Sequence, residues 1–249
     1  MLKQSLIIAR KEIKDSVRDV RSVVSSLLYA LMGPAVVGMV SMAIPRGAQG
    51  SKVLIGMMSV FTLVSAFVGG MNIAMDTVAG ERERRSLLPL LLNPVRRLDF
   101  AIGKWLAISV FSLAGLAVNL LGFAALLGLP SLLITGIGIL PLALLAAGLQ
   151  LLISATCRAL KETQTYLSMI VFLPMGLGMF LVFFPAAARG WCRFLPIAGQ
   201  QIQLESIMSG VAIHLVQPIA LGLLTSALAM LALLIAANRL QRDEIIFGD

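Results

Sequence analysis

The sequence predicts an all-α, polytopic membrane protein with six transmembrane helices and an N-terminal amphipathic interfacial helix. Hydrophobic residues make up 59% of the 249 residues, charged residues make up 13%, and the mean hydropathy is +0.96. Soluble domains average about 45–50% apolar residues. The apolar residues form long segments of about the 20 residues needed to cross a bilayer core, separated by charged or turn-forming residues. Residues 1–249 are therefore expected to form a single transmembrane domain.

Residues 1–21 precede the first span and carry apolar side chains three or four positions apart, which predicts an amphipathic helix. The apolar stripe consists of Leu2, Leu6, Ala9, Ile13, Val17 and Val20. Because the basic residues lie off this stripe, the helix is expected to lie in the membrane interface. A solvated helix packed on protein is the alternative.

The six spans are predicted at residues 22–45, 53–76, 105–128, 132–157, 166–185 and 212–237. The first is expected to remain as an anchor, because its apolar run is too long for a signal peptide and follows a charged segment. The segment 186–211 is too polar to span, and a short helix at about 199–209 is expected to dip into the membrane or lie flat on it. Trp191 suits the aromatic belt of a membrane interface.

The distribution of basic residues predicts the orientation, because cytoplasmic loops retain an excess of Lys and Arg. With the N-terminus inside, all Lys and Arg residues fall on the cytoplasmic side except Arg46, Lys52, Arg189 and Arg193. Both termini are therefore expected in the cytoplasm, with the chain multi-pass in the inner (plasma) membrane. The net charge of +8 is interpreted as a topology signal and an attraction to lipid headgroups, not as a nucleic-acid site.

Residues that could carry catalysis are scarce. The chain has one histidine, His214, and lacks a G-x-x-x-x-G-K-[ST] motif, so neither a zinc site nor ATP hydrolysis by this chain is expected. Cys157 and Cys192 are predicted on opposite sides of the membrane, which excludes a disulfide within one chain.

Asn72 and Asp76 are four residues apart, on one helical face at the inner end of the second span. They are candidates for a polar inner gate that binds substrate or an ion. Alternatively, Asp76 acts as a helix cap or pairs with Arg82 or Arg84.

A run of five charged residues, Glu81 to Arg85, interrupts the apolar chain. At the membrane centre five charges would cost about 12–17 kcal/mol, so the run is expected in the cytosol between the second and third spans. A short helix is predicted here, begun by Glu81 and Glu83 and ended near Asn93-Pro94. Asp99 is then expected to cap the third span.

Closely spaced leucines follow the charged run, at Leu87, Leu88, Leu90, Leu91 and Leu92. An exposed apolar cluster rimmed by charge marks a binding surface. The leucines either enter a groove on another protein or pack on this chain's own helix ends.

The string "DTVAGERERRSLLPLLLNPVRRLDFAIGKWLA" resembles the signature cytoplasmic loop of type-2 ABC exporter permeases. The start, "ARKEIKDSVRDVRSV", resembles their N-terminal elbow helix, and "ANRLQRDEIIFGD" is similar to the ending of the NatB-like branch. Members of that branch often carry a large outer domain after the first span. This chain has only "IPRGAQGSK" there, which argues against transferring a sodium substrate.

The resemblance implies a half-transporter that pairs with a second permease copy or homologue. Each permease would dock one of two separate ABC ATPase subunits through a coupling helix at about Glu81 to Pro94. The charged motif is matched by Glu81, Arg82, Glu83 and Arg85, the docking turn by Leu87 to Leu92, and the loop's exit by Gly103-Lys104.

ATP and Mg would be bound by the partner ATPase, with no cofactor in this chain. The expected function is ATP-driven export of a hydrophobic or amphipathic substrate. The alternatives are an ATPase-independent secondary transporter or channel, and a non-transporting membrane anchor for an ATPase.

Overall fold

The computed structural model describes residues 2–44, 47–84, 96–127, 131–185, 190–211 and 216–240, and all its regular elements are helical. Six helical segments in this part of the chain are long and apolar enough to cross a membrane. This confirms the predicted fold class. The segments are Val20–Ala43, Gln49–Glu83, Arg97–Ala125, Gly138–Thr156, Leu160–Phe183 and Val216–Arg239.

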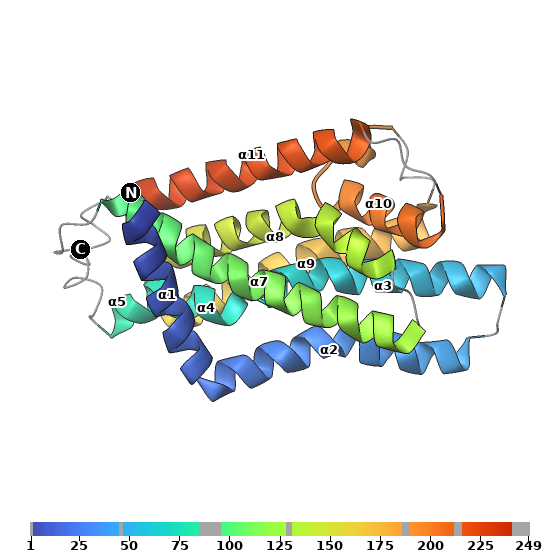
Figure 1. Ribbon diagram of the computed structural model, residues 1–249, viewed down its shortest axis with the longest axis horizontal. Coiled ribbons are helices and arrows are strands. Elements are labelled where there is room, and N and C mark those ends of the chain that lie inside the picture. The colour runs from blue at the N-terminus through green and yellow to red at the C-terminus, as the bar shows by residue number, and fades with distance from the viewer. Residues whose placement is uncertain are drawn as a thin grey trace.

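The long helices run along a common direction and form one bundle, and α1 crosses one end of it (Figure 1). In chain order they are α1 Leu2–Arg18, α2 Val20–Ala43, α3 Ala48–Val68, α4 Met71–Met75, the π-helical turn η1 Asp76–Gly80, α5 Glu81–Glu83, α7 Arg97–Leu127, α8 Ser131–Thr156, α9 Leu160–Phe183, the 3₁₀ turn η3 Gly190–Phe194, α10 Ala198–Met208 and α11 Val216–Arg239. We refer to the "α1 end" of the bundle, where α1 and α5 lie, and to the opposite "α10 end" (Figure 1).

The interior consists of two apolar clusters, one toward each end. The cluster toward the α10 end includes Phe67, Phe123 and Leu204, and the cluster toward the α1 end includes Ile73 and Leu151. Helix α8 packs against α7 and α11 and contributes to both clusters. This continuous core supports the site described below.

Helix α1 packs on α7 with a face that differs from the predicted apolar stripe. Ser5, Ala9 and Glu12 are buried, whereas Leu6 and Val17 are more than half exposed. The two helices approach closely at Gly103, where a Cβ atom would lie 2.7 Å from the Cβ of Ile8. The helix therefore packs on protein through one face and leaves Leu6 and Val17 of its apolar stripe uncovered by this chain.

Three helices extend well beyond the spans predicted for them. The second continues beyond residue 76 to Glu83, the third begins at Arg97 instead of 105, and the fifth begins at Leu160 instead of 166. Asp99 consequently lies in the first turn of α7 and is not its cap; its Oδ1 accepts a hydrogen bond from Ser5 Oγ at 3.3 Å. The helices of the second and third spans can extend past the predicted ends because charged side chains in the added turns have partners.

The short helix expected at about 199–209 is confirmed as α10. It is packed into the bundle, since Gln200, Gln201 and Leu204 are buried and α10 contacts α3, α8, α9 and α11. Buried amides need hydrogen bonds, and Gln200 donates to Thr225 Oγ1 at 2.9 Å while Gln201 donates to the Gly178 carbonyl at 3.0 Å.

The second span is interrupted between α3 and α4, at Gly69-Gly70. A Cβ atom at Gly69 would lie 2.9 Å from the Phe111 carbonyl oxygen, so this position tolerates only glycine without displacing α7. The side-chain amide of Gln150 on α8 donates to the Phe67 carbonyl at the end of α3. The span thus consists of α3 and a separate segment, Met71–Glu83, at the α1 end.

Candidate functional site

The site is built from four consecutive charged residues at the end of the second span, Glu81 to Arg84. They end a helix that continues from Met71, and so they do not begin a separate short helix as the sequence suggested. Of the predicted coupling residues, Arg85, Leu87, Leu88, Leu90, Leu91, Leu92 and Pro94 lie outside the described residues.

Glu81 binds a lysine that is completely buried in the bundle. Lys104 on α7 is 0% exposed, and its Nζ lies 2.8 Å from Glu81 Oε2 and 3.2 Å from Glu12 Oε1. The same nitrogen donates to the Thr77 carbonyl and lies 4.7 Å from the centre of the Phe100 ring. Lys104 therefore joins α1, the second span and α7.

This arrangement explains how a lysine can lie inside a transmembrane helix. A buried charge is very costly unless it is paired and hydrogen-bonded, and Lys104 has two carboxylates and a carbonyl as acceptors. The predicted third span begins just after Lys104, and no role was predicted for Glu12. The sequence carries one signal for the burial of Glu12. This residue shares a helical face with Ser5 and Ala9, the small side chains through which α1 packs on α7.

Arg82 and Glu83 bind the facing ends of α8 and α9. Arg82 donates to the carbonyls of Cys157 and, at 3.2 Å, of Ala155, at the C-terminal end of α8 where a positive charge is favourable. Glu83 Oε2 accepts from the backbone N–H of Leu160 at 3.1 Å. Since Ala159 has no side chain that can cap α9, Glu83 supplies the acceptor that a helix N-terminus needs.

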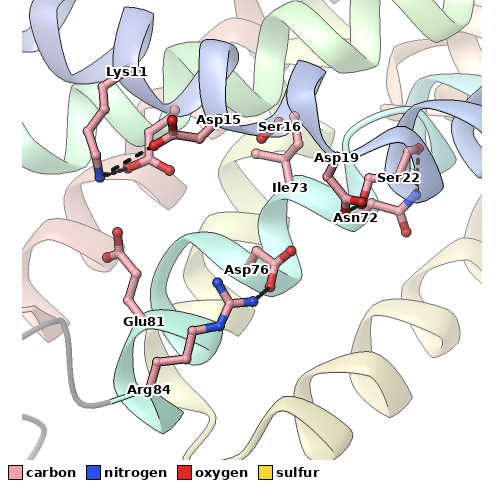
Figure 2. Close-up of a pocket in the computed structure, with 11 residues that line it drawn as sticks. Lys11, Asp15, Ser16, Asp19, Ser22, Asn72, Ile73, Asp76, Glu81 and Arg84 are labelled. Carbon is pink, nitrogen blue, oxygen red and sulfur yellow. Dashed lines mark hydrogen bonds and ion pairs between the residues drawn. The ribbon is translucent and has the colours of Figure 1, made fainter.

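Arg84 is paired with Asp76, with Nη2 and Oδ1 separated by 2.9 Å (Figure 2). This was one of the partners expected for Asp76. Both side chains are well exposed, at 67% and 44%, so the pair contributes little to stability.

A pocket of about 350 Å³ adjoins these residues, between α1, the start of α2 and the segment 71–84 (Figure 2). Asn72 and Asp76 both line it, as their shared helical face predicted. Asn72 donates to Ser25 Oγ at 2.8 Å and so ties α4 to α2. Carboxylates outnumber cations among the lining side chains, which are Lys11, Glu12, Asp15, Ser16, Asp19, Ser22, Asn72, Ile73, Asp76, Glu81 and Arg84.

The described residues contain no group of three or more His, Cys, Asp or Glu side chains that could hold a metal ion. The cysteines lie at opposite ends of the bundle, as predicted, with Cys157 after α8 at the α1 end and Cys192 in η3 at the α10 end. Cys157 is buried, and this burial raises the pKa of its thiol.

Comparison with known proteins identifies the family. The profile described as "ABC-2 family transporter protein" matches residues 11–237. The chain is also 37% identical over 137 residues to the ABC transporter permease protein NatB of Bacillus subtilis (strain 168); the match covers 49% of this chain and 35% of that relative. The chain therefore spans only about a third of that relative's length. By the extent of the family match and its six candidate spans, this protein belongs to the ABC-2 family of transporter proteins and is a multi-pass membrane protein.

Proposed function

We propose that this chain is the membrane-spanning subunit of an ATP-driven exporter and that the segment from Glu81 to Pro94 is its contact with a separate ATPase. The charged start of this segment carries the proposal, because Glu81, Arg82 and Glu83 bind different parts of the bundle. A displacement of the segment would act on α1 and α7 through Lys104, on α8 through Arg82 and on α9 through Glu83.

The proposed movement would reach α3 at Gly69-Gly70, where the helix of the second span is interrupted. The segment Met71–Glu83 is bound to its other neighbours by charged contacts. ATP-driven closure of two ATPase subunits would move the segment Met71–Glu83 in each of two paired permeases, and α3 would follow through the break. Asn72 and Asp76 lie on the moving segment and line the pocket of Figure 2, which suits a role in an inner gate.

In this proposal the α1 end faces the cytoplasm, with both chain termini, and ATP and Mg are bound by the ATPase. The substrate class proposed is a hydrophobic or amphipathic molecule. Many apolar side chains on α2 and α9 are exposed in a single chain, including Leu28, Met42 and Phe172. Such surfaces suit contact with lipid, a second permease subunit or an apolar substrate.

The docking contact is tested by co-purification with an ABC ATPase from a neighbouring reading frame. Leu88→Asp and Leu91→Asp place a charge among the leucines and are expected to abolish recovery of the ATPase with the tagged permease. Leu195→Asp is the matched control, because Leu195 is exposed at the α10 end and should leave recovery unchanged. Full recovery of the ATPase with both docking variants would refute the assignment.

The exporter function has a separate readout, which is substrate-dependent ATP hydrolysis by the complex in lipid vesicles. Export that needs ATP and stops when the ATPase is inactivated supports the proposal. Transport that continues without any ATPase would instead indicate a secondary transporter or channel, and an assembled complex that never transports would indicate a membrane anchor.

A further inference from the structure

A second pocket lies at the α10 end, far from the charged segment. It is lined by residues of α3, α9 and α10. Helices α3 and α9 touch in its wall, where a Cβ atom on Gly56 would lie 2.8 Å from Val182 Cγ2. The pocket has a volume of about 470 Å³, within the range of about 300–1,000 Å³ typical of ligand sites.

Glu205 of α10 provides a carboxylate whose two oxygens have different surroundings. Oε1 accepts hydrogen bonds from Ser59 Oγ at 3.1 Å and from Gln201 Nε2 at 2.9 Å. These two donors hold the side chain in one orientation. Within the described residues Oε2 has no hydrogen-bond donor, so one oxygen of an oriented carboxylate stays available to a ligand.

Lys52 of α3 lines the same pocket. It is exposed, and among the described residues its ammonium group is not ion-paired with Glu205 or with any other carboxylate. Apolar side chains, among them Val53, Leu181 and Val182, form much of the remaining wall. The pocket therefore presents one carboxylate oxygen and one ammonium group beside an apolar surface.

The charges discriminate between classes of ligand. A simple cation would be attracted by Glu205 but repelled by Lys52. An anionic lipid would be attracted by Lys52 but repelled by Glu205. A head group that carries both an ammonium and a phosphate complements both residues. The pocket also lies at the ends of two spans, which begin and end at Gln49 and Phe183, where lipid head groups are found.

We propose that this pocket binds the head group of an aminophospholipid of the surrounding membrane. The lipid's ammonium group donates to Glu205 Oε2, its phosphate faces Lys52, and its first hydrocarbon groups cover the apolar wall. The site is distinct from the ATPase contact, so it neither requires nor supports the proposed docking.

The test is native mass spectrometry of the purified full-length chain in detergent with equal amounts of phosphatidylethanolamine and phosphatidylglycerol. The wild type should retain phosphatidylethanolamine in preference to phosphatidylglycerol. Glu205→Gln keeps an oxygen that can accept from Ser59 and Gln201 but removes the charge. It should lower the ratio of the two bound lipids about tenfold, the equivalent of one charge-assisted hydrogen bond.

Lys52→Gln removes the charge that faces the phosphate. It should weaken retention of both lipids and leave their ratio nearly unchanged, because both carry a phosphate. Since Lys52 is exposed, this variant should fold, and it provides a test that does not depend on the Glu205 variant.

Matched controls are available at the opposite end of α9. Glu162→Gln and Lys161→Gln make the same changes away from the pocket and should leave both retention and ratio as in the wild type. Equal retention of the two lipids by the wild type would overturn the proposal. An unchanged ratio in Glu205→Gln, or unchanged retention in Lys52→Gln, would also overturn it.

Discussion

Replacing Lys104 tests whether the buried charge cluster holds the α1 end together. Lys104→Met keeps a similar volume but leaves Glu81 and Glu12, which are each only 9% exposed, without their shared cation. Removing one partner of a buried ion pair typically costs about 3–5 kcal/mol. We expect a loss near the middle of this range, because neutralising a carboxylate by proton uptake would relieve part of the penalty. The measurement is the free energy of unfolding in mixed micelles.

The second variant separates charge from packing. Lys104→Met combined with Glu81→Gln removes one of the two uncompensated carboxylates and should recover at least about 1 kcal/mol, since interacting pairs couple by about 0.5–3 kcal/mol. Glu162→Gln in the Lys104→Met background is the control and should recover nothing. If Lys104→Met unfolds like the wild type, or if the loss is the same with and without Glu81→Gln, the cluster does not carry the stability assigned to it.

Two further predictions follow from the structure. Burial raises the pKa of the Cys157 thiol, so at pH 8 this thiol should hold less thiolate, and react with a maleimide more slowly, in the folded protein than after unfolding. In intact cells an impermeant maleimide should modify only Cys192, and modification of Cys157 from outside would contradict the proposed orientation. Gly103→Leu should collide with Ile8, push α1 away from α7 and cost about 1–3 kcal/mol in unfolding free energy, whereas Gly176→Leu, with open space at its Cβ, should have a much smaller effect.

The six spans could be predicted from the sequence because each needs only length and apolar composition, and neither depends on a partner. The ends of the corresponding helices could not be predicted in the same way. The charged run from Glu81 was expected in a separate helix beyond the second span because unpaired charges in hydrocarbon are costly, but the cost of each charge depends on the groups that it contacts. Lys104, the end of α8 and the start of α9 supply those partners, and they come from residues up to 77 positions away along the chain.

The packing face of the N-terminal helix also could not be predicted from its periodicity. Its apolar stripe is present, yet the face that packs on α7 contains Ser5 and Glu12, which periodicity alone assigns to the polar side. The residues of the signature loop are enough to indicate the family. They do not indicate that Glu81 and Lys104, which lie 23 residues apart in the motif, are in contact.

The two ends of the bundle are held by different chemistry, and this bears on how the chain could move. At the α1 end, ionic contacts through Lys104, Arg82 and Glu83 join the segment Met71–Glu83 to α1, α7, α8 and α9. At the α10 end, Gln200 and Gln201 join α10 to α11 and α9 through uncharged donors and acceptors. A force on the charged segment would reach those four helices directly, whereas it would reach α3 through the Gly69-Gly70 connection and through the packing of α3 on α7 and α9. A concerted movement of the α1 end, with α3 following through these contacts, is the motion that this distribution of contacts favours.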